Sequence, residues 1–117
     1  SGPRSLRGVL HAAGVLRDML LRSMDAVAIR YVFAPKALGA SGIHHIVSKA
    51  PLDVLGLFSS VASVFGTVGQ INYAAANTYM EALAFRHRLI GTVGWCMQIP
   101  YVIGAVRLED SQTRIML

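Results

Sequence analysis

The chain has 117 residues, of which 54% are apolar and 15% charged, and its net charge is +5. This charged fraction is well below the usual value of about 25%, which excludes a disordered chain and predicts a large buried core. The eleven basic residues are scattered, so the sequence lacks the basic stripe or reader motif of a nucleic-acid-binding protein. No apolar run is long enough for a membrane helix. We therefore expect no nucleic-acid or membrane partner.

The single cysteine, Cys96, lies in an apolar run, which favours a buried and inert thiol over a nucleophile. Nothing in this use of cysteine points to an oxidising compartment, so we expect a cytoplasmic protein. The low charge and the start without methionine suggest a segment of a larger protein, with apolar faces that other parts would cover.

The first half of the chain predicts a strand followed by a long helix. Residues 6–13 form a short apolar run that Gly14 closes, which is typical of a buried strand. Helical periodicity extends over 26–47, with Ser23 and Asp25 as candidate helix caps. Pro35 lies inside this pattern, so we expect a kink or a break there.

The second half predicts a strand, a loop, a helix and a further strand. The near-continuous apolar run over 52–59 is typical of a strand that is covered on both faces. Residues 60–70 are predicted as a loop, and 72–88 as a long alanine-rich helix that ends at Gly91. Residues 93–99 predict another buried strand.

Alternating strands and helices indicate an α/β fold with a parallel sheet. The few strands and crossover helices predict only part of a doubly wound sheet, so we treat 1–117 as a single partial domain. No Gly-x-Gly-x-x-Gly loop follows a predicted strand, and residues 105–117 are predicted to begin a lid or helix.

Candidate site residues lie where the predicted strands end, because ligands bind at the carboxyl ends of parallel strands. The first strand ends in small residues that allow a flat ring to approach the backbone. The second ends near Ser60, and Tyr73 and Asn77 then share one face at the start of the next helix. A serine hydroxyl can polarise a ketone, and a phenol can protonate the alkoxide that reduction leaves. A cation such as Lys36 lowers the pKa of a phenol.

Ordinary structural roles remain alternatives for each of these residues. A tyrosine in an alanine-rich helix is commonly packed in the core or at an interface. Ser60 suits a turn, and Lys36 suits a solvated helix position. Spacing alone therefore leaves the enzymatic and the structural interpretations open.

The motifs closely resemble ketoreductase domains of polyketide synthases, which belong to the short-chain dehydrogenase/reductase (SDR) superfamily. Their active-site block resembles LFSSVAS at 57–63 together with GQINYAAAN at 69–77. GVLHAAGVL at 8–16 resembles their cofactor-side strand, and APKALGA at 34–40 resembles a helix of the same domains. The resemblance covers 7–104 and implies a Rossmann-like SDR fold. This segment would lack the N-terminal dinucleotide-binding strands.

The resemblance implies a role for each candidate residue. Tyr73 matches the proton donor, and Ser60, 13 residues before it, matches the serine that binds the substrate carbonyl. Most short-chain dehydrogenases have lysine four residues after the tyrosine, where this chain has Asn77. In this chain a lysine lies instead in the earlier predicted helix, at Lys36, an exchange typical of synthase ketoreductases. Lys36 would lower the pKa of Tyr73 and hold the nicotinamide ribose, and Asn77 would support proton relay.

The resemblance also implies the cofactor and the direction of substrate entry. Ala12, Ala13 and Gly14 would line the nicotinamide riboside of NADPH together with Lys36 and Tyr73, and no metal is expected. Asp18 matches the last residue of a Leu-Asp-Asp signature that guides the acyl chain in B-type ketoreductases, although Arg17 departs from that signature. A-type enzymes have tryptophan at the position of Phe65. We therefore predict a B-type enzyme that forms a D-configured 3-hydroxyl.

The predicted function is NADPH-dependent reduction of a β-ketoacyl thioester to the 3-hydroxyacyl thioester, within a polyketide or fatty-acid synthase. The expected partners are an acyl carrier protein, with the chain on its phosphopantetheine, and the other synthase domains. The alternative is a structural SDR-like domain that does not reduce. Because the phosphate loop is missing, the isolated segment is predicted to be inactive.

Overall fold

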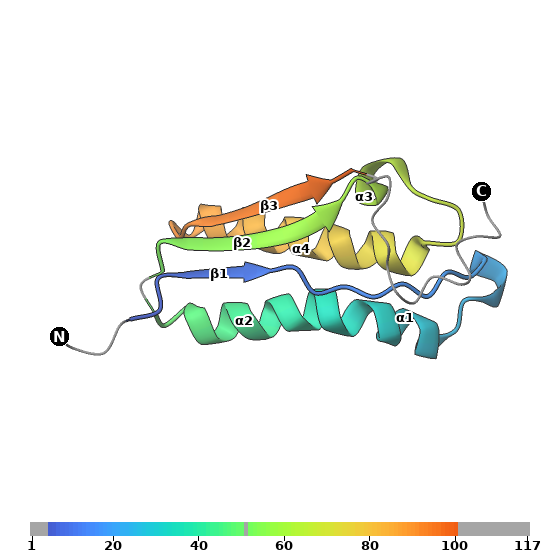
Figure 1. Cartoon of the computed structure of the whole chain (residues 1–117), viewed down its shortest axis with the longest axis horizontal. Coiled ribbons are helices and arrows are strands. Elements are labelled where there is room, and N and C mark those ends of the chain that lie inside the picture. The colour runs from blue at the N-terminus through green and yellow to red at the C-terminus, as the bar shows by residue number, and fades with distance from the viewer. Residues whose placement is uncertain (1–4, 51, 101–117) are drawn as a thin grey trace.

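The computed structural model describes residues 5–50 and 52–100. In this part of the chain, strands β1 (Gly8–His11), β2 (Val54–Ser60) and β3 (Gly94–Ile99) form one parallel sheet in the order β1-β2-β3. All three carboxyl ends lie at the same edge (Figure 1). The predicted parallel α/β fold is confirmed. β1 is shorter than the predicted strand, and the lid or helix predicted at 105–117 lies outside the described residues.

One long helical segment connects β1 to β2. It consists of α1 (Ala26–Phe33), a π-helical turn η2 (Ala34–Leu38) and α2 (Gly39–Val47). It follows a loop that contains the short 3₁₀ helix η1 (Leu21–Ser23). Asp25 caps α1 as predicted, because its carboxylate accepts the Ala28 N–H at 2.7 Å.

Of the kink or break predicted at Pro35, the structure shows an interruption of the α-helical pattern and no end of the helix. The α-helical pattern changes there to a π turn, in which the Gly39 N–H donates to the Ala34 carbonyl, and the helix then continues. A proline lacks an N–H and its ring clashes with the carbonyl four residues earlier, and the wider turn accommodates both effects without ending the helix. The turn buries Lys36 and Ala37.

Two helices connect β2 to β3. The short helix α3 (Ala62–Phe65) lies within 60–70, a segment predicted as a loop, and the long helix α4 (Ile71–Leu89) follows. The predicted helix over 72–88 is therefore confirmed to within a residue at each end. Gly91, with φ 80°, occupies the left-handed conformation just after α4, as its position in the sequence predicts.

The hydrophobic core lies between one face of the sheet and helices α2 and α4. Its buried cluster comprises Ala40, Val47, Leu55, Leu57, Met80, Leu83 and Ala84. Both crossover connections therefore bring their helices to the same face of the sheet. Two right-handed crossovers that progress in one direction along a sheet produce this arrangement. No helix among the described residues is long and apolar enough to cross a membrane.

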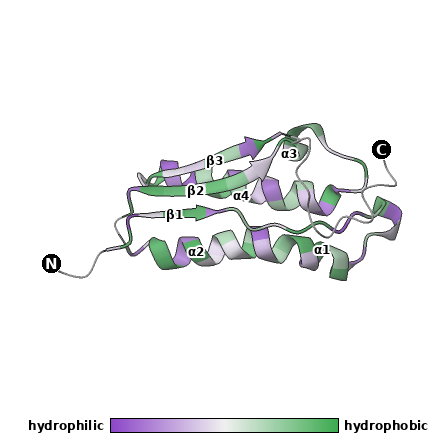
Figure 2. Cartoon of the chain, in the orientation of Figure 1, coloured by the Kyte–Doolittle hydropathy of each residue, from purple (hydrophilic) through white to green (hydrophobic). Residues whose placement is uncertain are grey.

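The opposite face of the sheet is apolar and open to solvent. Leu10 is 63% exposed there, and the rings of Phe58 and Trp95 meet edge to face at 5.6 Å. A Cβ at Gly56 would lie 2.5 Å from Trp95, so this ring packs over a position that requires glycine. β2 is largely hydrophobic along its length (Figure 2). The exposed apolar face predicted from the sequence is confirmed.

Candidate active site

The predicted site residues come from three elements at the carboxyl edge of the sheet. Tyr73 and Asn77 occupy the first turns of α4, Lys36 lies in the π turn, and Ser60 is the last residue of β2. Tyr73, Asn77 and Lys36 are 7%, 0% and 4% exposed. The alternative of a solvated Lys36 is therefore excluded, and burial of three polar side chains here requires specific partners.

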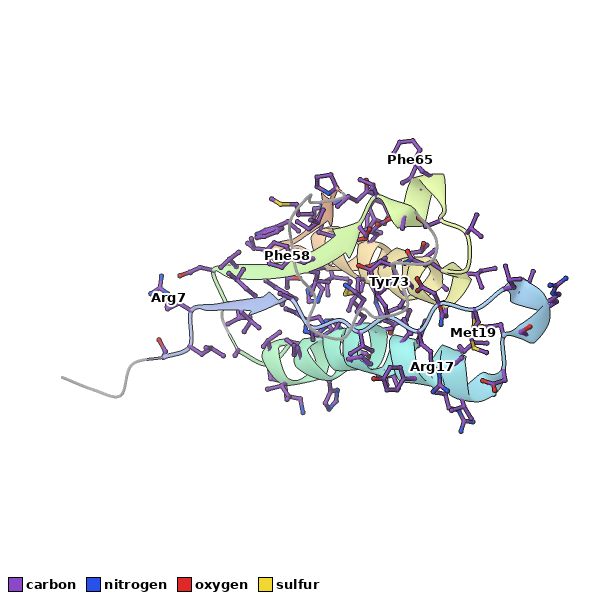
Figure 3. All side chains as sticks on the ribbon, turned by 45° about the vertical axis from the view of Figure 1, so that its right-hand side comes forward. Arg7, Arg17, Met19, Phe58, Phe65 and Tyr73 are labelled. Atoms are coloured by element: carbon purple, nitrogen blue, oxygen red, sulfur yellow. The ribbon has the colours of Figure 1, made fainter. Side chains whose placement is uncertain are left out.

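Lys36 crosses the interior to reach both β2 and Tyr73. Its Nζ donates to the Phe58 carbonyl at 3.0 Å and lies 5.4 Å from the centroid of the Tyr73 ring. A Cβ at Gly14 would lie 2.9 Å from Lys36 Cε, so the glycine after β1 leaves room for the lysine stem. Figure 3 shows Tyr73 in the interior of the molecule, on the side of α4 that faces the π turn. The structure thus brings Lys36 and Tyr73 together.

Asn77 connects to Tyr73 through the helix backbone. Its Nδ2 donates to the Tyr73 carbonyl at 3.0 Å. Its Oδ1 is buried and has no hydrogen-bond partner within residues 5–50 and 52–100. A buried acceptor without a partner costs stability, and in native proteins it often marks a place for water or a ligand.

Ser60 keeps its hydroxyl proton available. Its Oγ accepts the Ala62 N–H at 3.2 Å and, as far as the structure is described, donates to no protein acceptor. Ser60 is two residues after Phe58, whose carbonyl binds Lys36. The hydroxyl is therefore oriented by the start of α3 and can donate to another group.

Asn72, which the sequence analysis missed, anchors the start of α4. Its Nδ2 donates to the carbonyls of Arg17 and Ala28 at 3.0 and 3.2 Å, and its Oδ1 accepts the Tyr73 N–H at 2.8 Å. The residue thereby ties the loop after β1 and helix α1 to the backbone of Tyr73. The sequence signal that could have identified Asn72 is the position of its polar amide directly before Tyr73.

Asp18 lies beside the loop that leads into α4. Its Oδ2 accepts from Gln70 Nε2 at 3.1 Å, whereas its buried Oδ1 has no partner in the part of the chain that the structure describes. The Met19 N–H also donates to the Gly69 carbonyl at 2.9 Å. The loop after β1 is therefore clamped to the entrance of α4.

Ala12, Ala13 and Gly14 follow β1 as an exposed strip of small residues. With no bulky side chain on this strip, a flat ring can approach the backbone beside Lys36. The open strip, with Gly14 against the Lys36 stem, leaves room for a nicotinamide riboside beside Lys36. Phe65, in contrast, is 83% exposed and points away from the molecule in Figure 3.

Glu81, a second residue that the sequence analysis missed, gathers donors from three elements. Its Oε1 accepts from Ser59 of β2, from Ser63 of α3 at 2.5 Å and from Gln98 of β3 at 3.1 Å. Burial would raise the pKa of Glu81, but these hydrogen bonds outweigh it, so the pKa is lowered and the group is ionised. No local spacing pattern links these residues in the sequence.

Cys96 lies half-buried on β3 near Glu81. Burial, together with the negative charge of Glu81, raises the pKa of its thiol to about 11. A thiol with so high a pKa carries little thiolate near neutral pH, which confirms the predicted inert cysteine.

The arrangement suits proton donation to a polarised oxygen. A buried phenol lies beside a buried ammonium group, and a serine hydroxyl with an available proton stands at the end of the adjacent strand. Such a set can hydrogen-bond a carbonyl oxygen and protonate it as negative charge develops.

Comparisons with known proteins agree with this geometry. A family model described as "KR domain" matches residues 1–104. Among solved structures, A-type ketoreductases from a modular polyketide synthase are 35% identical with a TM-score of 0.77, over 80% of this chain and 20% of theirs. A ketoreductase domain from the bacillaene assembly line is 28% identical with a TM-score of 0.79, over 97% of this chain and 29% of its own.

Curated relatives are much longer than this chain. Polyketide synthase GfsA of Streptomyces halstedii is 50% identical over 88 residues, which is 75% of this chain and 1% of that protein. The highly reducing polyketide synthase calA of Penicillium decumbens is 39% identical over 109 residues, or 93% of this chain and 4% of that protein. The match to the family model over most of its length shows that the chain belongs to the KR domain family, the ketoreductase domains of polyketide synthases.

Proposed function

We propose that this chain carries the catalytic half of a domain that reduces a β-ketoacyl thioester to the 3-hydroxyacyl thioester with NADPH. The observation that carries the proposal is the buried pair of Tyr73 and Lys36 at the carboxyl edge of the sheet. Burying a lysine against a tyrosine ring costs free energy, and buried charges of this kind are found mostly at functional sites.

The side chains divide the chemistry among them. Ser60 donates its hydroxyl proton to the substrate carbonyl oxygen and so polarises it. Tyr73 gives its phenolic proton to the same oxygen as charge develops there. The positive charge of Lys36 favours release of that proton. Asn77 Oδ1 is an acceptor for a water molecule that returns a proton to this site.

Ala12, Ala13 and Gly14 would hold NADPH, which would supply the hydride for this reduction. Lys36 would hold its nicotinamide ribose, and Tyr73 would lie at the reacting end. The small residues of the strip support this placement because they keep the backbone accessible.

The partners follow from the relatives, which are multidomain polyketide synthases of which the chain spans a few per cent. We expect the substrate to arrive on the phosphopantetheine of an acyl carrier protein, with other synthase domains in the same polypeptide. Asp18, clamped by Gln70, would guide the acyl chain and favour a D-configured 3-hydroxyl.

The test is NADPH oxidation by the full-length protein that contains this chain, on a β-ketoacyl thioester. Tyr73→Phe is expected to lower kcat by about 10²- to 10⁴-fold, the usual worth of a positioned proton donor, with NADPH affinity kept. Tyr79→Phe is the matched control, because Tyr79 is an exposed tyrosine of the same helix that packs against Phe33. It should reduce the substrate as the wild type does.

A wild type that binds NADPH but does not reduce the thioester would favour the alternative, a structural domain without turnover. Residues 1–117 alone are expected to be inactive. Measurable turnover by this segment would contradict the assignment of the phosphate-binding part to other sequence.

A further inference from the structure

The cluster around Glu81 surrounds Ser60 without containing it. Ser59 immediately precedes Ser60 and donates to Glu81 Oε1. Ser63, three residues after Ser60, lies with its Oγ 2.5 Å from the same oxygen and 2.9 Å from the Ser60 carbonyl. The backbone on both sides of Ser60 is thus held to a single carboxylate oxygen.

The carboxylate is well suited to this task. An ionised carboxylate accepts hydrogen bonds only, and bonds to a charged acceptor are about twice as strong as neutral ones. Three donors converge on Oε1, from Ser59, Ser63 and Gln98. A glutamine at this position would offer these donors a neutral amide oxygen in place of a charged one, and its own N–H groups would need acceptors.

The cluster also connects to the hydroxyl of Ser60. Ser60 Oγ accepts the Ala62 N–H, and Ala62 begins the helix that carries Ser63. A shift of α3 away from Glu81 would move this N–H and release the Ser60 hydroxyl from its orientation. Glu81 therefore acts on the hydroxyl through two hydrogen bonds and one short helix.

We propose that Glu81 is a positioning residue that fixes the orientation of the Ser60 hydroxyl toward the substrate carbonyl, by tying Ser59 and Ser63 to α4. The kinetic consequence rests on the proposed function. The structural consequence, an ordered turn at 59–63, does not.

The first measurement is amide hydrogen exchange in the full-length protein, which needs no turnover. Glu81→Gln is expected to speed exchange of the Ala62 N–H at least several-fold, because that N–H is bonded to Ser60 Oγ. Ser63→Ala removes one donor and keeps the carboxylate, so it should produce a smaller increase at the same amide. Thr78→Ala is the control, because the Thr78 hydroxyl donates to the Ala74 carbonyl within α4.

The second measurement is a double-mutant cycle on kcat. Glu81→Gln is expected to lower kcat about tenfold with NADPH affinity kept, since small misplacements of reacting groups slow catalysis strongly. When Ser60→Ala is already present, the same change should lower kcat less than about twofold, because the residue through which Glu81 acts is gone. A purely structural role would multiply the two effects.

Unchanged exchange at Ala62 in both Glu81→Gln and Ser63→Ala would overturn the proposal, whether or not the protein reduces a thioester. Multiplicative effects on kcat would overturn it as well. A wild type that does not reduce the thioester would reject the proposed function, and faster exchange at Ala62 would still support the positioning role.

Discussion

Polar side chains are buried near both ends of α4, but the two ends differ in whether the buried polar atoms have hydrogen-bond partners. At the N-terminal end of α4, near the carboxyl edge of the sheet, Asn77 Oδ1 and Asp18 Oδ1 are buried and have no hydrogen-bond partner among the residues that the structure describes. Near the other end of the helix, His87 is 3% exposed and both of its ring nitrogens are bonded.

The bonding at His87 forms a closed chain. Thr92 donates its hydroxyl proton to the His87 carbonyl at 2.8 Å, so its oxygen accepts from His87 Nδ1–H at 2.8 Å. His87 Nε2 is then an acceptor, and His44 Nδ1–H donates to it at 2.5 Å. This assignment makes His87 neutral, and the bond between His44 and His87 ties α2 to α4.

This difference in hydrogen bonding separates groups that stabilise the fold from groups that we propose bind water or a ligand. In the hydrogen-bond network around His87, the polar atoms have partners within the protein and need no water or ligand. An open acceptor costs free energy until water or ligand reaches it. We therefore expect changes at the site to alter activity and changes at His87 to alter stability, and the experiments below test this separation.

The largest effect is expected for Lys36→Met. This change removes the charge beside Tyr73 and keeps much of the stem, so kcat should fall by about 10²-fold or more. Stability should stay the same or rise, because a buried charge is replaced by an apolar group of similar size. Turnover and urea denaturation of the full-length protein measure the two quantities. Retained activity would contradict the expectation that changes at the site near Tyr73 alter activity.

The next effect is expected for His87→Leu. The change leaves His44 Nδ1 without its acceptor and removes the ring N–H that donates to Thr92, whose hydroxyl keeps its bond to the backbone carbonyl of residue 87. The loss should cost about 1–3 kcal/mol of unfolding free energy. Activity of the folded protein should remain, because His87 lies toward the far end of α4 from Tyr73. Chemical denaturation gives the stability. A loss of kcat without a loss of stability would contradict the assignment.

A pH dependence should follow from the same histidine. Burial, with the charges of His44 and Arg86, lowers the pKa of His87 below its usual 6.5. The unfolded chain therefore binds the proton more tightly, and stability should fall as the pH decreases from about 6.5 toward the lower folded pKa. His87→Leu should flatten this slope. The lowered pKa of Glu81 acts separately, as the pH falls below its ordinary 4.5.

The smallest effect is expected for Asp53→Asn. The pair of Arg7 and Asp53 is exposed on both sides and belongs to neither end of the comparison. Solvent screens such pairs, so a thermal scan should show no resolved change in Tm. A clear decrease in Tm would mean that the exposed pair of Arg7 and Asp53 contributes to stability, contrary to this expectation.

Much of the architecture follows from local pattern. Apolar runs determined the strands, Asp25 and Gly91 determined helix ends, and the turn spacing of Tyr73 and Asn77 placed both on one helix face. These signals act over a few residues, so they can be read without the fold. At Pro35 the sequence predicted a kink or a break, and the structure has a π turn that interrupts the α-helical pattern without ending the helix, while burying Lys36 and Ala37.

By itself, the sequence determined the parallel α/β order and the set of residues that we propose polarise and protonate a carbonyl. Only the tertiary structure decided their partners. Lys36 reaches Phe58 across 22 residues, Glu81 reaches Ser59 across 22, and His44 reaches His87 across 43. Periodicity reports which face of an element is buried, but which polar groups meet there depends on how separate helices pack onto the sheet.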